Sequence, residues 1–183
     1  MPKAAAAFPV LTTRRLRLRQ VEPRDAVALH ACFSDPTAMR YWNFPSSYSL
    51  AETEKIMGWL GKASSPYSTL AWTVARKTDD ACIGMVNYHN REARHARLDI
   101  GYIIAPGEQR RGLGAEAVAA LVAYCEGTLK VHRITALIHP DNVASIALAE
   151  AAGFALEGGP LKDFWRVGEE WRSVMVYARL GGG

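Results

Sequence analysis

The sequence predicts a single α+β domain, a mostly antiparallel twisted sheet of about seven strands flanked by about four helices. Two observations predict this class. Of the 183 residues, 49% are hydrophobic and 22% are charged, and no repeat or proline-rich linker divides the chain, so residues 1–183 are expected to form one domain. Segments with the period of a strand are also mixed with segments that have the period of a helix, as in a layered sheet-and-helix fold.

The N-terminal third predicts one strand and two helices. Residues 1–10 carry a short apolar run broken by a proline and are expected to form a loose tail. Residues 11–21 alternate apolar and basic side chains, which predicts a half-buried strand with its charges on the solvated face. Residues 23–33 predict a helix with proline in its first turn, and residues 49–60 predict a second helix that opens with a capping box. An aromatic loop at 41–45 lies between the two helices.

The middle of the chain predicts an antiparallel meander followed by the main helix. Apolar and β-branched runs at 68–76, 82–88 and 95–104 predict three strands, and turn-forming residues at 77–80 join the first two. Residues 112–127 predict the main helix, because one stripe is apolar at every fourth position: Leu113, Ala117, Leu121 and Cys125.

The C-terminal part predicts three more strands around a short helix. Residues 133–140 form an apolar run closed by proline, which indicates a buried strand. Residues 155–167 and 171–180 predict a final antiparallel pair, joined by a turn at 168–170. This pair completes the predicted mixed sheet.

A glycine loop leads from the strand at 95–104 into the main helix. The segment reads Gln109-Arg-Arg-Gly-Leu-Gly-Ala115, and a glycine loop that opens a helix aims several free backbone N–H groups at one point. Such a site holds phosphate groups, and Arg110 and Arg111 add positive charge beside it. Neither a Walker loop nor a dinucleotide fingerprint fits, because no Gly-Lys-Ser/Thr occurs in the chain and Ala117 stands where the third glycine would be needed.

A second motif follows the strand at 133–140. Asp141 or Asn142 can cap the start of a helix, and Gly153 stands where a left-handed C-terminal cap belongs. The spacing Asn-x-x-Ser-x(7)-Gly-Phe ends at Phe154. Together with the glycine loop, it resembles the GNAT superfamily of acetyl-CoA-dependent N-acyltransferases. The T-x-R-L-x-L-R run that begins at Thr13 is similar to the opening of the Rim-type branch, the ribosomal-protein N-terminal acetyltransferases.

The resemblance implies a GNAT-like sheet whose fourth and fifth strands splay apart and a site for acetyl-CoA as acyl donor, with no metal. The splayed strand pairs its backbone with the pantetheine arm, and the glycine loop holds the pyrophosphate. The residues that it assigns to the cofactor are Tyr102, Ile103, Ile104, Gln109, Arg110, Arg111, Gly112, Leu113, Gly114, Ala115, Asn142 and Ser145.

The catalytic groups match the family less well. Ala149 occupies the position of the usual tyrosine acid, so Ser145 is the candidate proton donor, with helix packing as its alternative role. Trp165 occupies the position of the Rim-type glutamate base. Asp99 is therefore the candidate base, with water relay to solvent as an alternative and Glu157, Asp163 and Tyr88 as weaker candidates.

The resemblance implies transfer of an acetyl group to a primary amine by direct attack in a ternary complex. The acceptor is expected to be a protein N-terminal α-amine, as of a ribosomal protein, or a small-molecule amine, bound by Tyr41, Trp42 and Tyr88. The missing tyrosine and glutamate support a second hypothesis, a non-catalytic domain of the same fold that binds CoA or another partner.

Charge and composition exclude several other classes. The chain has a net charge of +4 and a pI near 9.1. It has neither a basic stripe with interleaved aromatic residues nor the signature of a nucleic-acid-binding module, so no direct nucleic-acid partner is expected. No run reaches the ~18–20 apolar residues of a membrane span, and the protein is expected to be cytoplasmic, as a monomer or homodimer. The cysteines lack the spacing of a disulfide framework, and Cys32, Cys82 and Cys125 are expected to be reduced thiols in the core. The histidines lack the spacing of a metal site, and polar residues at strand ends are expected at His89, His95, His132 and His139.

Overall fold

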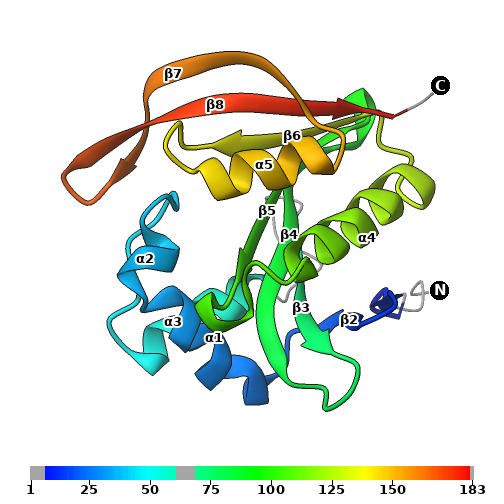
Figure 1. The fold of residues 1–183 in the computed structure, drawn as a ribbon, viewed down its shortest axis with the longest axis vertical. Coiled ribbons are helices and arrows are strands. Elements are labelled where there is room, and N and C mark those ends of the chain that lie inside the picture. The colour runs from blue at the N-terminus through cyan, green and yellow to red at the C-terminus, as the bar shows by residue number, and fades with distance from the viewer. Residues whose placement is uncertain (1–6, 61–68, 182–183) are drawn as a thin grey trace, which may run out of the picture.

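One eight-stranded sheet runs through the computed structural model, which describes residues 7–60 and 69–181 (Figure 1). The strand order is β1-β2-β3-β4-β5-β6-β8-β7, and β5 and β6 form the parallel pair in an otherwise antiparallel sheet. The strands are β1 (Leu11–Thr12), β2 (Leu16–Gln20), β3 (Leu70–Arg76), β4 (Cys82–Glu92), β5 (Arg97–Ile104), β6 (Arg133–Ile138), β7 (Ala155–Val167) and β8 (Glu170–Leu180). The α-helices are α1 (Ala26–Phe33), α2 (Pro36–Met39), α3 (Leu50–Leu60), α4 (Leu113–Gly127) and α5 (Val143–Ala151).

The predicted fold class is confirmed, with one more strand and one more helix than expected. The strand expected at 11–21 is a short hairpin, because the chain turns at residues 13–15, where the Thr13 N–H donates to the Leu16 carbonyl over 2.9 Å. The extra helix is α2, whose amides at Thr37 and Ala38 donate to the Asp35 carboxylate. Four residues are too few to give a helical pattern in the sequence.

Part of the expected N-terminal tail packs against the sheet. Residues 1–6 lie outside the described residues. The Phe8 ring meets Trp72 edge-on at 5.7 Å between ring centroids, and the Trp72 indole N–H donates to the Pro9 carbonyl over 2.6 Å. The chain is therefore held to the core before β1 begins.

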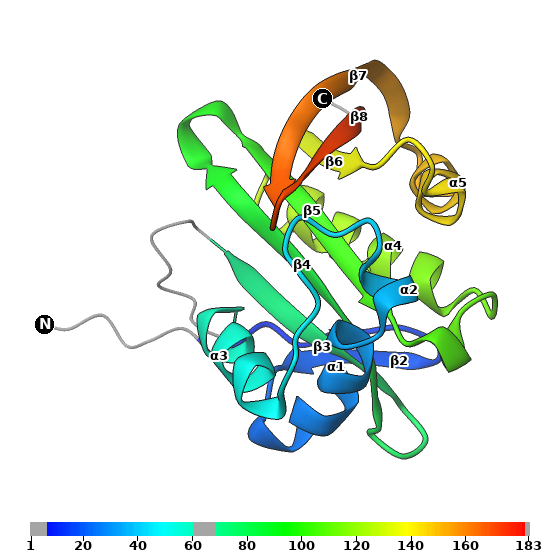
Figure 2. The same cartoon turned by 90° about the vertical axis from the view of Figure 1, so that its left-hand side faces the viewer.

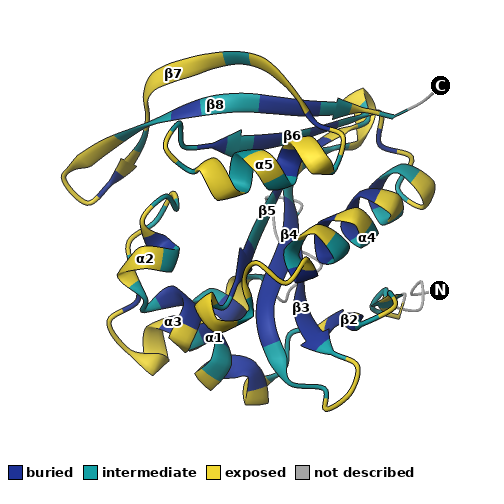
Figure 3. Cartoon of the chain, in the orientation of Figure 1, coloured by how far each residue is buried: buried dark blue, intermediate teal, exposed yellow. Residues whose placement is uncertain are grey.

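Helices cover both faces of the sheet. In Figure 2, α1 and α3 lie on one face, with α4 behind it, and Figure 3 shows that the strands between them are buried. On the α4 face, all four residues of the predicted stripe are buried, which confirms the helical pattern: Leu113, Ala117, Leu121 and Cys125. On the α1 face, Met85 and Ile103 join α1 and α3 in a second cluster.

The basic run at the N-terminus departs from its expected solvated face. Arg19 is buried, and its guanidinium donates two hydrogen bonds of 2.8 Å to Asp25 and further ones to Asp80. Burial raises the pKa of Asp25, but hydrogen bonds from Arg19, from the Glu22 backbone and from Thr73 outweigh it, so the pKa of this carboxyl is lowered. β2 is an inner strand covered by the turn before α1, which is why one of its charges is enclosed.

The parallel pair opens after three residues. Pairing of β5 with β6 runs from Arg97 with Arg133 to Asp99 with Thr135 and stops there. Beyond that point, β5 stays paired with β4 and β6 with β8, so the inner edges of the two strands part (Figure 1). The structure thus has the splay that the resemblance implies.

Candidate functional site

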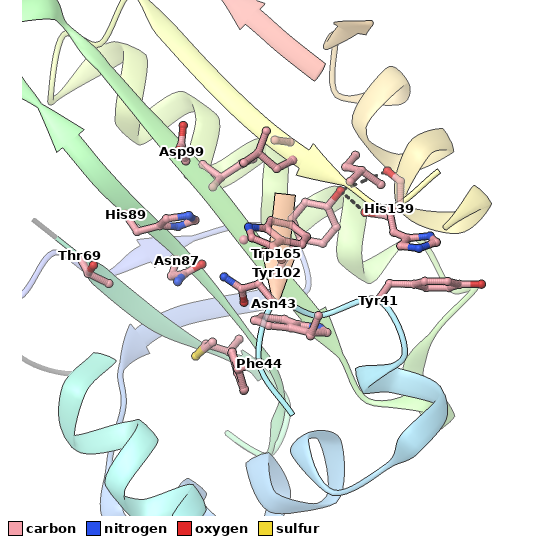
Figure 4. Close-up of a pocket in the computed structure, with 18 of the residues that line it drawn as sticks. Tyr41, Asn43, Phe44, Thr69, Asn87, His89, Asp99, Tyr102, His139 and Trp165 are labelled. Carbon is pink, nitrogen blue, oxygen red and sulfur yellow. Dashed lines mark hydrogen bonds between the residues drawn. The ribbon is translucent and has the colours of Figure 1, made fainter. Parts of the chain in front are cut away.

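A cavity of about 340 Å³ lies where β5 and β6 part. Its lining comes from β4, β5, β6 and the start of α5 on one side, and from the loop at 41–44, α3 and β7 on the other (Figure 4). Segments far apart in the sequence therefore line one cavity, with polar side chains of the sheet facing aromatic side chains across it.

The glycine loop lies at the start of α4, as the sequence predicts. Gly112 is the N-cap in the left-handed region, with φ of +71°, and no side chain caps the helix. The first backbone bond of the turn runs from the Glu116 N–H to the Gly112 carbonyl, so the amides of residues 113–115 precede it. Free amides and the positive end of the helix dipole favour an anionic group here.

Neighbouring side chains hold this loop in shape. The Gln109 side chain donates to the Ile104 carbonyl over 2.9 Å, which ties the loop to the end of β5. Arg15 donates to the Arg111 carbonyl over 2.9 Å and to Glu116 over 2.6 Å. Burial raises the pKa of Glu116, but hydrogen bonds from Thr13 and Arg15 outweigh it and lower that pKa to about 2. The Gln109 side chain therefore holds the loop against the end of β5.

Several of the other residues assigned to the cofactor can offer a ligand only their backbone groups. Ile103, Ile104 and Leu113 are buried in the core, so only their backbone groups are available to a ligand. A Cβ at Gly114 would lie 3.0 Å from Leu148, so this glycine lets α4 and α5 pack closely. Ala115 is exposed at the helix start.

Ser145 and Tyr102 meet across the splay. Asn142 caps α5 by accepting from the Ser145 N–H over 3.2 Å, which points the first turn of the helix at β5. The Tyr102 hydroxyl lies 2.7 Å from the Ser145 hydroxyl, and it also donates to the Ser145 carbonyl over 3.2 Å (Figure 4). Burial raises the pKa of Tyr102, so the phenol stays protonated. From the sequence, only the backbone of Tyr102 was expected to act here.

The aromatic loop forms the opposite wall. Tyr41 stacks on His139 with 4.9 Å between ring centroids, and the Trp42 carbonyl accepts from Arg172 of β8 over 2.5 Å. Trp165 of β7 lines the same cavity. The structure thus brings together the loop and the last hairpin.

Tyr88 does not belong to this wall. It is buried with Trp72 and Tyr124 on the α4 face of the sheet, so the expectation that it binds substrate is wrong. Alternation along β4 gives the reason, because Tyr88 points away from the face that carries Asn87 and His89. The same alternation could have singled out those two residues.

Asp99 lies at the end of the β5–β6 pairing and lines the cavity, where its carboxylate accepts from Asn90 over 3.0 Å. The weaker candidates lie elsewhere: Glu157 is ion-paired with Arg133 and Asp163 is exposed on β7. His89, expected to be an ordinary strand-end residue, lines the cavity directly opposite Asp99.

Comparison with known proteins decides the family. The profile of the acetyltransferase (GNAT) domain matches residues 15–155. The chain belongs to the GNAT family of acetyltransferases. It is 32% identical over 151 residues to the uncharacterized N-acetyltransferase YoaA of Bacillus subtilis, covering 82% of this chain and 85% of the relative.

Two further proteins to which the chain is similar are named for different acceptors. The chain is 28% identical to the [ribosomal protein uS5]-alanine N-acetyltransferase of Escherichia coli, covering 92% of this chain and 89% of the relative. It superimposes on the spermidine N-acetyltransferase of Vibrio cholerae, solved with CoA and spermine, with a TM-score of 0.78 at 23% identity over 92% of this chain and 96% of the other.

This GNAT enzyme is therefore an acetyl-CoA-dependent N-acetyltransferase. The uncapped start of α4 and the open inner edge of β5 suit the phosphates and the amide-bearing arm of that donor. Within residues 7–60 and 69–181, no helix is long and apolar enough to cross a membrane.

Proposed function

We propose that the enzyme transfers the acetyl group directly to a primary amine that enters the cavity between the aromatic wall and the splay. One observation carries the proposal: a single cavity is lined by Ser145 and the open edge of β5 on one side and by Tyr41 and Trp42 on the other. Donor and acceptor can thus meet at the splay without an enzyme-bound acyl group.

The residues divide between donor and acceptor. Bound acetyl-CoA supplies the acetyl thioester. The amides of 113–115, with Arg110 and Arg111 beside them, hold its phosphates, and the β5 backbone at 102–104 orients the arm. The Ser145 hydroxyl, 2.7 Å from Tyr102, gives a proton to the departing sulfur. Asp99 lies on the acceptor side and takes part in removing the amine proton.

Two acceptor classes follow from the relatives, a protein N-terminal amine as in the E. coli enzyme and a small amine as in the V. cholerae enzyme. We place the reaction in the cytoplasm, in keeping with three free cysteines, Cys32, Cys82 and Cys125.

A thiol-release assay tests the proposal. Purified enzyme is given acetyl-CoA with peptides that begin with alanine, with arylalkylamines, with amino-acid esters and with spermidine, and acetylated products are identified by mass spectrometry. Amide product in equal amount to free CoA supports the proposal. Acetyl-CoA binding by calorimetry without thiol release on any acceptor would favour the non-catalytic alternative.

A further inference from the structure

Two polar atoms on β4 face the cavity without a partner. Asn87 and His89 lie two residues apart on the strand and so share a face (Figure 4). Val86 and Tyr88 belong to the core cluster on the opposite face. Asn87 Oδ1 and His89 Nδ1 are buried and have no hydrogen-bond partner among the described residues. A buried polar atom without a hydrogen bond is destabilising, so both atoms are suited to a ligand that donates hydrogen bonds.

The backbone opposite Asn87 lacks a side chain. A Cβ at Gly101 would lie 2.6 Å from Asn87 Oδ1, so only glycine leaves room for this amide against β5. Gly101 is two residues beyond Asp99, the last residue of β5 that pairs with β6. The free amide oxygen is therefore held at the mouth of the splay, where an amine must arrive to meet the thioester.

The His89 ring faces one carboxylate. Asp99 on β5 is the direct cross-strand partner of His89. The positive charge of Arg133 on β6 interacts electrostatically with Asp99. Burial lowers the pKa of His89, and Asp99 offsets only part of that effect, so the ring is neutral at pH 7. Among the described residues that line the cavity, the other titratable side chains are those of Tyr41, Tyr102 and His139. The remaining polar and aromatic lining residues are uncharged and include Trp42, Asn43, Phe44, Trp59, Thr69 and Trp165.

The lining also limits the acceptor. Among the lining residues that the structure describes, Asp99 is the one carboxylate and there is no lysine or arginine. One carboxylate can balance one ammonium group but not the several charges of a polyamine. The aromatic wall at Tyr41, Trp42 and Phe44 suits an apolar body, because apolar surface of the ligand is removed from water against it.

We propose that Asn87, His89 and Asp99 form the acceptor-amine subsite, which takes a monoamine with an apolar body and in which His89 is the general base. This rests on the proposed function. Asp99 holds the ammonium form as it enters, Asn87 accepts one N–H, and His89 removes a proton from the nitrogen. The nitrogen then bonds to the acetyl carbon, the carbon–sulfur bond breaks, and the sulfur takes the proton of Ser145. The second proton of the nitrogen passes through water to the Ser145 oxygen, and His89 releases its proton to solvent.

His89→Gln tests the base, because glutamine keeps a polar group of similar size but cannot take the proton. We expect kcat/KM for phenethylamine at pH 7 to fall about 100-fold or more, and the acidic limb of its pH profile that belongs to His89 to disappear. The dissociation constant of acetyl-CoA should stay within about twofold. The matched control is His95→Gln, an exposed histidine after the same strand, with an expected change below about twofold.

Two outcomes separate this inference from the proposed function. If the wild-type enzyme acetylates amines and His89→Gln keeps kcat/KM within threefold with the same pH profile, the base assignment is overturned while the function stands. If the wild type acetylates no amine, the proposed function itself fails. For substrate class, phenethylamine should exceed spermidine in kcat/KM by at least tenfold, and the reverse order would overturn the monoamine assignment.

A measurement on the wild type covers the case in which the variant does not fold. The imidazole of His89, followed by NMR during a pH titration, should titrate below its ordinary value of 6.5. Addition of phenethylamine should shift its resonances. A midpoint at or above 6.5, or no shift on addition of amine, would overturn the subsite.

Discussion

Ala115→Glu places a negative charge at the start of α4 and so tests the phosphate site without disturbing the fold. Ala115 is exposed and lies three residues after the Gly112 N-cap. The glycines themselves are poorer probes, because any side chain at Gly112 would be strained at φ of +71° and one at Gly114 would press on Leu148. A glutamate in the first turn instead stabilises a helix by about 0.3–1 kcal/mol.

The expected loss of binding follows from charge repulsion. A carboxylate about 6 Å from a phosphate charge raises the free energy of the complex with acetyl-CoA. The increase is about 0.7 kcal/mol at the dielectric constant of water and about 2.8 kcal/mol at an effective dielectric constant of 20. Each 1.36 kcal/mol is a factor of ten, so acetyl-CoA should bind between about 3-fold and 100-fold more weakly. The two properties therefore move in opposite directions, with stability unchanged or slightly higher and affinity lower.

Ala119→Glu is the matched control. Ala119 is exposed on the same helix, and four residues at ~1.5 Å each place it about 6 Å further from the phosphate than Ala115. The total separation of about 12 Å exceeds the Debye length of ~8–10 Å. Calorimetry with acetyl-CoA and urea unfolding are measured on both variants. The control should bind within about twofold of the wild type. Equal affinities for Ala115→Glu and the wild type would refute the placement of phosphate at α4.

Three further predictions address catalysis and stability. Ser145→Ala should lower kcat about 10-fold or more while the acetyl-CoA dissociation constant changes less than threefold, measured by steady-state kinetics and calorimetry, and unchanged kcat would make the serine structural. The pKa of Glu116 falls from 4.5 to about 2 on folding, so its contribution to stability is present above pH 4.5 and is lost as the pH falls toward 2. Urea unfolding of Glu116→Gln should show a deficit on the order of 1–2 kcal/mol at pH 7 that vanishes near pH 2, and a constant deficit would contradict the linkage. Asp25→Ala leaves Arg19 buried without its main partner and should cost about 3–5 kcal/mol of unfolding free energy, whereas a loss below about 1 kcal/mol would contradict the buried pair.

Local patterns in the sequence were enough for most elements. α4 carries its stripe at every fourth residue, and α5 is capped by Asn142 and ends before Gly153, so spacing and caps alone define both helices. The hairpins of the sheet have turn residues at their joins. These features depend on neighbours along the chain, and the structure confirms them.

Features that depend on distant partners were missed. Arg19 has the alternation of a solvated strand, and only the arrival of Asp25 and Asp80 makes its burial tolerable. β4 was expected to end at Tyr88 but continues to Glu92, because Asn90 at φ of +52° forms an irregularity that shifts the pairing with β5.

The candidate site shows the same division. The glycine loop and Asn142 are motifs of consecutive residues, so the sequence alone predicts where the donor would bind. The acceptor side is built from β4, β5, the loop at 41–44 and β7, and no single segment carries its pattern. His89 became a candidate only when the structure set its partly buried ring opposite Asp99.

The central claim is that one cavity joins an acetyl-CoA site at α4 and β5 to an amine site at β4, and a single-turnover experiment tests it most directly. Enzyme in excess over isotopically labelled acetyl-CoA is mixed with phenethylamine and stopped at intervals for mass spectrometry. The account predicts one labelled amide for each CoA released, with the protein mass unchanged throughout. A labelled protein that forms before the amide, or CoA release without amide, would contradict it.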